Sequence, residues 1–118
     1  MAENFESILE TMKKMLGPTI EQYEIFDPDL IVHINTVFMV LHQLGVGPTE
    51  APFYISTGAE TWSDFMQGSA AEMAAVKSYM YFKLKLMFDP PSSAFVLTSI
   101  EKQIAELEWR MLVRAETP

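Results

Sequence analysis

The sequence predicts an all-α fold, a compact bundle of about four main helices with a long loop carrying a short helix between helices two and three. Apolar residues recur at spacings of three and four in four separate segments. Gly17-Pro18 and Pro90-Pro91 interrupt this pattern where helices are expected to end. A length of 118 residues fits one domain, so we expect residues 1–118 to form a single domain with a short exposed C-terminal tail, 114–118.

The first helix is expected to begin after Asn4, a good N-cap residue, and to stop at Gly17-Pro18. Its apolar positions have helical spacing: Phe5, Ile8, Leu9, Met12, Met15 and Leu16. Residues 19–26 are too short to assign, since one turn of helix or an extended link would serve equally well.

The second helix has a clear start, because Asp27 can cap it and Pro28 suits the first helical position. It is expected to end at Gly45. One side of the helix carries Leu30, Ile34, Val37, Leu41 and Leu44, flanked by Ile31 and Phe38. Val32 and Met39 fall on the opposite, polar side, which suggests that a partner covers this second face.

Residues 46–68 lose helical periodicity and accumulate Gly, Pro, Ser and Thr, so they predict a long loop with one short helix around residues 59–66. Loops of this length inside a compact domain are usually functional or flexible. The aromatic residues Phe53, Tyr54, Trp62 and Phe65 favour an ordered, docked loop. A small β-hairpin around residues 53–56 is a further expectation.

The third helix opens with the capping box formed by Ser69 and Glu72 and ends at Asp89, before two prolines. It is apolar nearly all the way round. One side carries Met73, Val76, Met80, Leu84 and Met87, and another carries Tyr79, Phe82 and Leu86. Such a helix is expected to be central, buried by its own chain and by something else.

The fourth helix, capped by Ser92 or Ser93, has two apolar faces. Its packing seam steps by three and four: Leu97, Ile100, Ile104, Leu107 and Met111. Phe95, Trp109 and Val113 lie on the opposite face. Because one core can use only one of these faces, the other is expected to contact a partner.

Charge and composition exclude several classes of protein. Sixteen acidic residues against eight basic ones give a net charge of −8, which argues against a basic nucleic-acid-binding face. The absence of cysteine excludes disulfides, thiolate metal sites and a cysteine nucleophile. The N-terminus does not resemble a signal peptide. Residues 30–46 are too polar and slightly short for a membrane span, so we expect a soluble intracellular protein with no membrane partner.

No catalytic, cofactor or metal site is predicted. His33 and His42 lack the Glu-x-x-His pairing of carboxylate-bridged metal centres. Gly45 and Gly47 fit a turn better than a phosphate loop. Glu101, Glu106 and Glu108 are explained by a solvated helix surface, and Lys77, Lys83 and Lys85 are expected to extend along apolar surface with their charges at its rim.

Four runs, taken together, resemble the head-tail connector (adaptor) proteins of tailed bacteriophages. These runs are residues 26–48, 60–65, 75–91 and 92–111, and the resemblance extends over roughly residues 5–113 in the same order and spacing. No single motif among them is catalytic. The resemblance to the family rests on the four runs taken together.

This resemblance implies a structural virion protein of the neck, assembled in the host cytoplasm. Proteins similar to this one form a twelvefold ring beneath the portal protein, extend the DNA channel and dock the head-closure or tail protein. The resemblance places Trp109, Val113 and Arg114 in subunit or portal contacts, and Phe95 lies on the same helix face. It places the loop residues Phe53, Tyr54, Trp62 and Phe65 against a neighbouring subunit or a downstream partner.

An acidic channel would let DNA pass without binding it, because like charges repel. A different class remains open: a DNA-packaging accessory protein similar to a small terminase subunit. That alternative needs a basic recognition helix, and only Lys13 and Lys14 cluster here. An enzyme ranks third, without a supporting set of residues.

Overall fold

The computed structural model describes residues 6–116, which form an all-α fold with a long loop between its second and third long helices. The elements are α1 (Ile8–Leu16), α2 (Pro18–Glu21), the 3-10 turn η2 (Glu24–Phe26), α3 (Asp27–Gln43), α4 (Trp62–Phe65), α5 (Ala70–Phe88) and α6 (Ala94–Glu116). The predicted fold class is confirmed, with α4 as the short helix within the loop.

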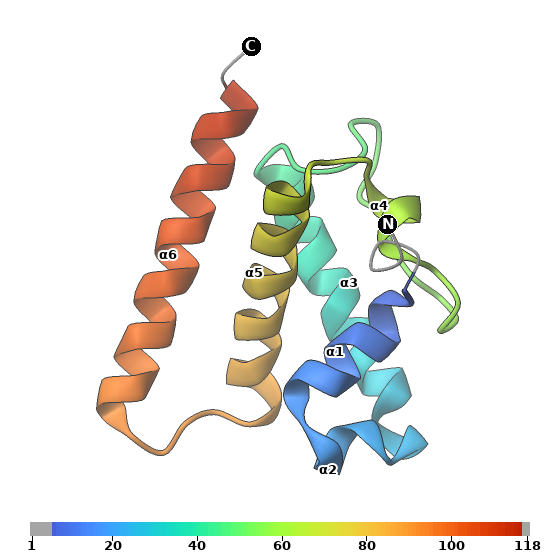
Figure 1. The fold of residues 1–118 in the computed structure, drawn as a ribbon, viewed down its shortest axis with the longest axis vertical. Coiled ribbons are helices and arrows are strands. Elements are labelled where there is room, and N and C mark those ends of the chain that lie inside the picture. Colours follow the sequence, from blue (N-terminus) through green and yellow to red (C-terminus); the bar gives the residue numbers. More distant parts are fainter. Residues whose placement is uncertain (1–5, 117–118) are drawn as a thin grey trace.

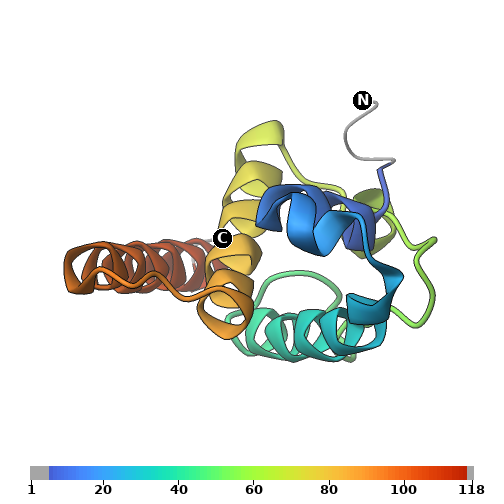
Figure 2. The same cartoon turned by 90° about the horizontal axis from the view of Figure 1, so that it is seen from below.

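Helix α5 is central, as its all-round apolar character predicts. It packs against α1 and α3 on one side and against α6 on the other (Figure 1). Figure 2 shows α6 standing apart at one edge, with α5 between it and the rest of the molecule. The core consists of apolar side chains from every long helix and from the loop: Ile8, Leu9, Met12, Ile20, Leu30, Ile34, Val37, Phe38, Leu41, Ile55, Trp62, Phe65, Met73, Val76, Tyr79, Met80, Leu84, Ile100, Ile104 and Met111.

Helix α1 begins later than predicted. Asn4 and Phe5 lie outside the described residues, and the observed N-cap is Ser7, whose Oγ accepts a hydrogen bond from the Glu10 amide at 3.2 Å. The same hydroxyl donates to the Gly58 carbonyl at 2.6 Å. Ser7 therefore both starts the helix and attaches it to the long loop.

Asp27 has a different role from the predicted one. No side chain caps α3, because the η2 turn runs directly into it. The Asp27 carboxylate instead lies 2.9 Å from Nζ of Lys13, whose side chain is only 5% exposed. A cation so deeply buried requires an opposite charge, and this requirement determines where Asp27 points.

The loop of residues 46–68 is ordered by side-chain hydrogen bonds. The side-chain Nδ2 of Asn35 donates to the backbone carbonyl of Ile55 at 2.9 Å, and the side-chain Oδ1 of Asn35 accepts from the backbone N–H of Ile55 at 2.8 Å. In a sheet, the backbone of a neighbouring strand would make this pair of hydrogen bonds. Residues 53–56 have no strand partner among residues 6–116, so the predicted β-hairpin is wrong. A single polar side chain satisfies the backbone there instead.

Both ends of α5 agree with the prediction. Ser69 and Glu72 form the reciprocal capping box, and Asp89 is the C-cap residue. Of the two candidate serines for α6, Ser93 accepts a hydrogen bond from the Val96 amide at 3.4 Å. Residues 114–116, predicted as the start of a tail, are the last turn of α6.

Residues 24–43 are long and apolar enough to cross a membrane by length and composition alone. The core helix of a soluble protein meets the same criterion. One side of α3 is buried within this chain, through Leu30, Ile34, Val37, Phe38 and Leu41.

Candidate interaction surfaces

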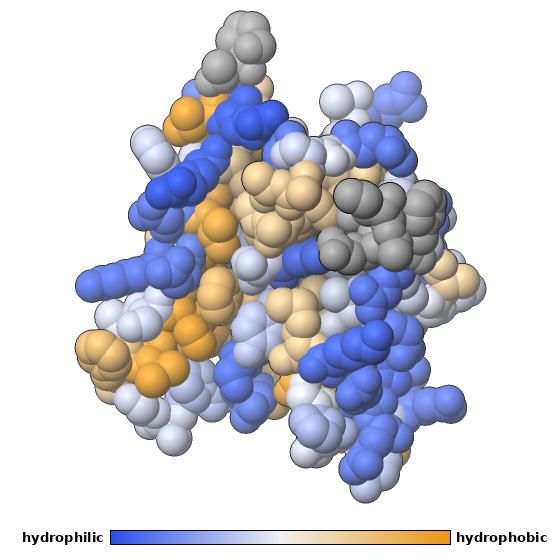
Figure 3. Space-filling view, in the orientation of Figure 1, coloured by the Kyte–Doolittle hydropathy of each residue, from blue (hydrophilic) through white to orange (hydrophobic). Residues whose placement is uncertain are grey.

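The outward face of α6 carries large apolar side chains outside the core. Only Ile100, Ile104 and Met111 of this 23-residue helix are buried. On the opposite face Phe95 is 80% exposed and Trp109 is 63% exposed. Figure 3 shows separate apolar patches along α6, with hydrophilic side chains between them and at the outer edge. The two-faced character predicted for this helix is confirmed, and Trp109 points away from the core.

Two polar contacts attach α6 to α5, and neither was predicted from the sequence. The Tyr79 hydroxyl donates to Oε2 of Glu108 at 2.7 Å, and burial together with this hydrogen bond raises the pKa of Tyr79. Arg114 donates to Glu72 at 2.9 Å near the start of α5. The spacing of Glu108 suggested only a solvated helix surface, because sequence cannot place it opposite a buried tyrosine.

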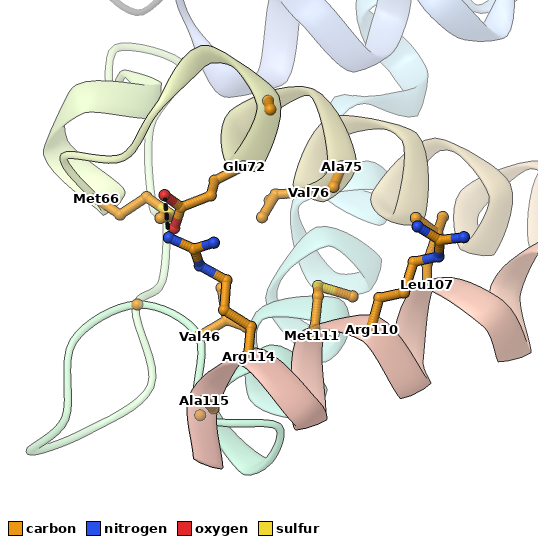
Figure 4. Close-up of a pocket in the computed structure, with 13 residues that line it drawn as sticks. Val46, Met66, Glu72, Ala75, Val76, Leu107, Arg110, Met111, Arg114 and Ala115 are labelled. Atoms are coloured by element: carbon orange, nitrogen blue, oxygen red, sulfur yellow. Dashed lines mark hydrogen bonds and ion pairs between the residues drawn. The ribbon is translucent and has the colours of Figure 1, made fainter. Parts of the chain in front are cut away.

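An apolar groove of about 360 Å³ lies between α5, α6 and the turn at residues 45–47 (Figure 4). It exists because α5 presents the small residues Ala71 and Ala75 here. Arg110 and Arg114 lie at its rim. Gly45, at φ +86°, closes one end; a Cβ atom there would lie 2.7 Å from Cβ of Ala115. The remaining lining residues are Val46, Gly47, Met66, Glu72, Val76, Leu107 and Met111.

The four aromatic residues predicted for a loop interface have different environments. Trp62 and Phe65 are buried in this chain's own core, at 0% and 3% exposure, so neither offers surface to a partner in this conformation. Trp62 Nε1 donates to the Thr11 hydroxyl at 3.0 Å. Phe53 packs edge-on against Phe38. These aromatic side chains dock the loop, and among the four only Tyr54, at 69% exposure, projects into solvent.

The outer face of α3 presents Val32 and Met39 at 61% and 53% exposure. Tyr23 and Ile25, just before α3, are also exposed, at 51% and 79%. Residues 19–26 have no clear periodicity, so the exposure of these two side chains was not predicted from the sequence. The available signal was the pair of carboxylates Glu21 and Glu24 beside Tyr23 and Ile25.

The lysines that could have formed a basic face are engaged inside the subunit. Lys13 pairs with Asp27, and Lys14 pairs with Glu6 at 2.9 Å. Lys77 lies 5.5 Å from the ring centroid of Trp62, and Lys83 lies 5.9 Å from that of Tyr79, so both follow aromatic surface as expected. Lys85 pairs with Asp89.

The two histidines have ordinary structural contacts. His33 packs edge-on against Phe88, and His42 Nδ1 lies 3.2 Å from the Pro48 carbonyl oxygen. Within residues 6–116, His, Asp and Glu side chains form no group of three that could hold a metal ion.

Comparison with known proteins identifies the family. The family model described as phage connector protein matches residues 8–118, nearly the whole chain. No curated protein and no solved structure matches it. Phage connectors are structural components of the head-tail junction of the virion, in agreement with the resemblance found in the sequence. The chain therefore belongs to the phage connector protein family.

Proposed function

We propose that this protein is the adaptor that assembles as a ring under the portal, extends the DNA channel and docks the head-closure or tail proteins. The observation that carries this proposal is the outward face of α6, where Phe95 and Trp109 are mostly exposed. Large exposed apolar residues rimmed by polar ones are typical of protein-protein contact sites. Family membership makes copies of this chain and the portal the natural partners.

The proposed subunit or portal interface consists of Phe95, Trp109, Val113 and Arg114, all exposed along α6. A second interface comprises Val32 and Met39 on α3, and Tyr54 extends the contacts to the loop. Phe53, Trp62 and Phe65 support this loop from inside the subunit. A subunit that presents two different patches forms a ring when the rotation between copies closes, and we propose twelve copies, matching the portal.

Charge supports a channel through which DNA slides. The chain carries a net charge of −8, and of the clustered lysines Lys13 is buried in an ion pair with Asp27. Phosphate is therefore repelled rather than retained. Lys13 is withdrawn from the surface by its buried pair with Asp27, which leaves Lys14 as the one exposed lysine of this cluster. This disfavours a DNA-packaging accessory role, which would need several cations on a recognition helix.

The test is a measurement of mass. The purified protein is first measured alone by light scattering and then mixed with the portal of its phage. We expect a complex with about one copy of this chain per portal subunit, because the portal holds weak lateral contacts at high effective concentration. If the protein does not bind the portal but binds duplex DNA at moderate salt, the result would instead support the packaging role.

A further inference from the structure

The groove between α5, α6 and the turn at residues 45–47 has an unusual combination of properties for this chain. Its walls are apolar, formed by Val46, Val76 and Met111 among others. Its rim carries Arg110 and Arg114 in a protein whose net charge is −8. We call it the arginine groove. Its volume of about 360 Å³ is near the lower end of the range for binding pockets, which gives room for one or two side chains rather than a helix.

Both arginines are available for exchange of partners. Arg110 bonds to Glu106 on its own helix at 2.7 Å, and Arg114 bonds to Glu72 at 2.9 Å. Their side chains are 67% and 69% exposed. Exposed ion pairs contribute little to stability, and each guanidinium keeps further N–H donors for a carboxylate that arrives from outside.

A surface with the complementary properties lies at the other end of the same molecule. Residues 21–25, from the last residue of the short helix α2 into the η2 turn, are all exposed and combine Glu21 and Glu24 with Tyr23 and Ile25. We call these four residues the acidic corner. The η2 turn directs Phe26 toward the core while leaving Ile25, at 79%, the most exposed large aliphatic side chain among residues 6–116.

The acidic corner cannot occupy the groove of its own subunit. Figure 1 shows α2 at the end of the molecule away from the C-terminus of α6, and the longest extent of the chain is 41 Å. No ion pair is formed by Glu21 or Glu24 within the described part of the chain. The pKa of Lys14 is raised chiefly by its hydrogen bond to Glu6 and that of Lys13 by its hydrogen bond to Asp27. The charges of Glu21 and Glu24 add smaller contributions, so both lysines already have another carboxylate as partner.

We infer that a second copy of this chain inserts its acidic corner into the arginine groove. Ile25 and Tyr23 then cover the apolar walls, while Glu21 and Glu24 face Arg110 and Arg114. The inference rests on the proposed function, because it assigns residues to one contact of the ring. Two different patches meeting in this way form a heterologous contact, which is the type that generates rings.

Disulfide capture tests the contact even when it is weak, because the chain contains no cysteine of its own. Ile25→Cys and Ala75→Cys proteins are mixed in equal amounts under mild oxidation. Ala75 lines the groove. The matched control replaces Ile25→Cys with Met87→Cys, which also removes an exposed apolar side chain and lies outside the proposed interfaces. We expect the 25–75 disulfide to form at least about tenfold faster than the control.

Charge reversal tests the pairing itself. Arg110→Glu with Arg114→Glu, added to the Ala75→Cys protein, is expected to slow capture by about tenfold through like-charge repulsion. Adding Glu21→Arg with Glu24→Arg to the Ile25→Cys protein is expected to restore it. Circular dichroism confirms that each variant is folded.

Equal capture rates for the test and control pairs, or failure of the second reversal to restore capture, would overturn the inference. The proposed function is judged separately, because the complex of wild-type protein with the portal is measured without any of these substitutions. A portal complex without the 25–75 disulfide leaves the adaptor role intact and removes only this contact.

Discussion

The Tyr79 hydroxyl donates a hydrogen bond of 2.7 Å to Oε2 of Glu108, which joins the central helix α5 to α6. Tyr79 is fully buried, so its hydroxyl has no water to replace this partner. The contact therefore helps to hold α6, and the faces proposed to bind partners, at a fixed orientation relative to the core.

Tyr79→Phe is expected to lower the free energy of unfolding by about 1.5–3 kcal/mol, the range typical of a hydrogen bond to a charged group. Urea titration followed by circular dichroism measures the change. Tyr81→Phe is the matched control, because no hydrogen bond of its hydroxyl is described within residues 6–116. Equal stability of wild type and Tyr79→Phe would mean that the bond does not hold α6.

Removal of Lys13 is expected to destabilise the fold strongly. Oδ1 of Asp27 is buried, and the Lys13 ammonium 2.9 Å away is the group that compensates its charge in the described chain. Lys13→Met leaves that carboxylate uncompensated, with an expected loss of about 3 kcal/mol in a urea titration.

The control is the double variant Lys13→Met with Asp27→Leu, which removes both charges and is expected to recover most of the lost stability. A double variant as unstable as Lys13→Met would show that the lysine acts through packing of its aliphatic chain instead.

The two tryptophans are predicted to have opposite effects. Trp109→Ala is expected to weaken assembly with the portal while the melting temperature of the isolated protein stays unchanged, because this side chain is 63% exposed. Trp62→Ala is expected to cost about 3–5 kcal/mol, since Trp62 is fully buried. Light scattering with the portal and thermal melting of the free protein separate the two effects.

Fluorescence provides an independent readout of Trp109. In a Trp62→Phe background it is the one remaining tryptophan of the chain. Its emission is expected to be quenched by iodide in the free protein and protected after the portal is added. Loss of stability in Trp109→Ala would place this residue in the core and contradict the interface assignment.

Glu60 is expected to make the stability of the loop depend on acid pH. Burial raises the pKa of its carboxyl, but hydrogen bonds from the Ser56, Thr57 and Glu60 amides and from the Thr57 hydroxyl outweigh burial and lower the pKa to about 2, from an ordinary value of 4.5. Because the folded-state pKa is depressed, the contribution is complete above pH 4.5 and is lost as the pH falls through about 2.

Urea titrations of wild type and Glu60→Gln between pH 2 and pH 6 measure this contribution. The difference between them is expected to shrink as the pH falls, whereas Glu50→Gln, at an exposed loop position, is expected to differ little from wild type. A difference that is independent of pH would show that the Glu60 carboxylate does not hold residues 56–60.

Local sequence patterns predicted the helices well where those patterns were strong. Ser69 and Glu72 marked the start of α5, the prolines after Asp89 marked its end, and the seam of α6 placed Trp109 outside. These features depend on residues that are close together in the sequence, so the sequence alone is enough to predict them. The family was also recognisable, since the order and spacing of four runs identify phage connectors.

Contacts between distant segments could not be predicted in the same way. Trp62 was assigned to an interface, yet it bonds to Thr11, 51 residues away, and is buried. Asp27 was assigned to a cap, yet it neutralises Lys13. In both cases the residues adjacent in the sequence suggest one role, but a residue from a different helix determines where the side chain lies.

The sequence by itself determined the all-α class, the helix limits set by strong caps and prolines, the outward Trp109 and the connector family. Only the tertiary structure decided which aromatic residues of the loop belong to the core, which helix Glu108 faces, and that Arg110 and Arg114 rim an apolar groove. The reason is physical: periodicity and capping act along the chain, whereas burial and ion pairing depend on which helices meet in space.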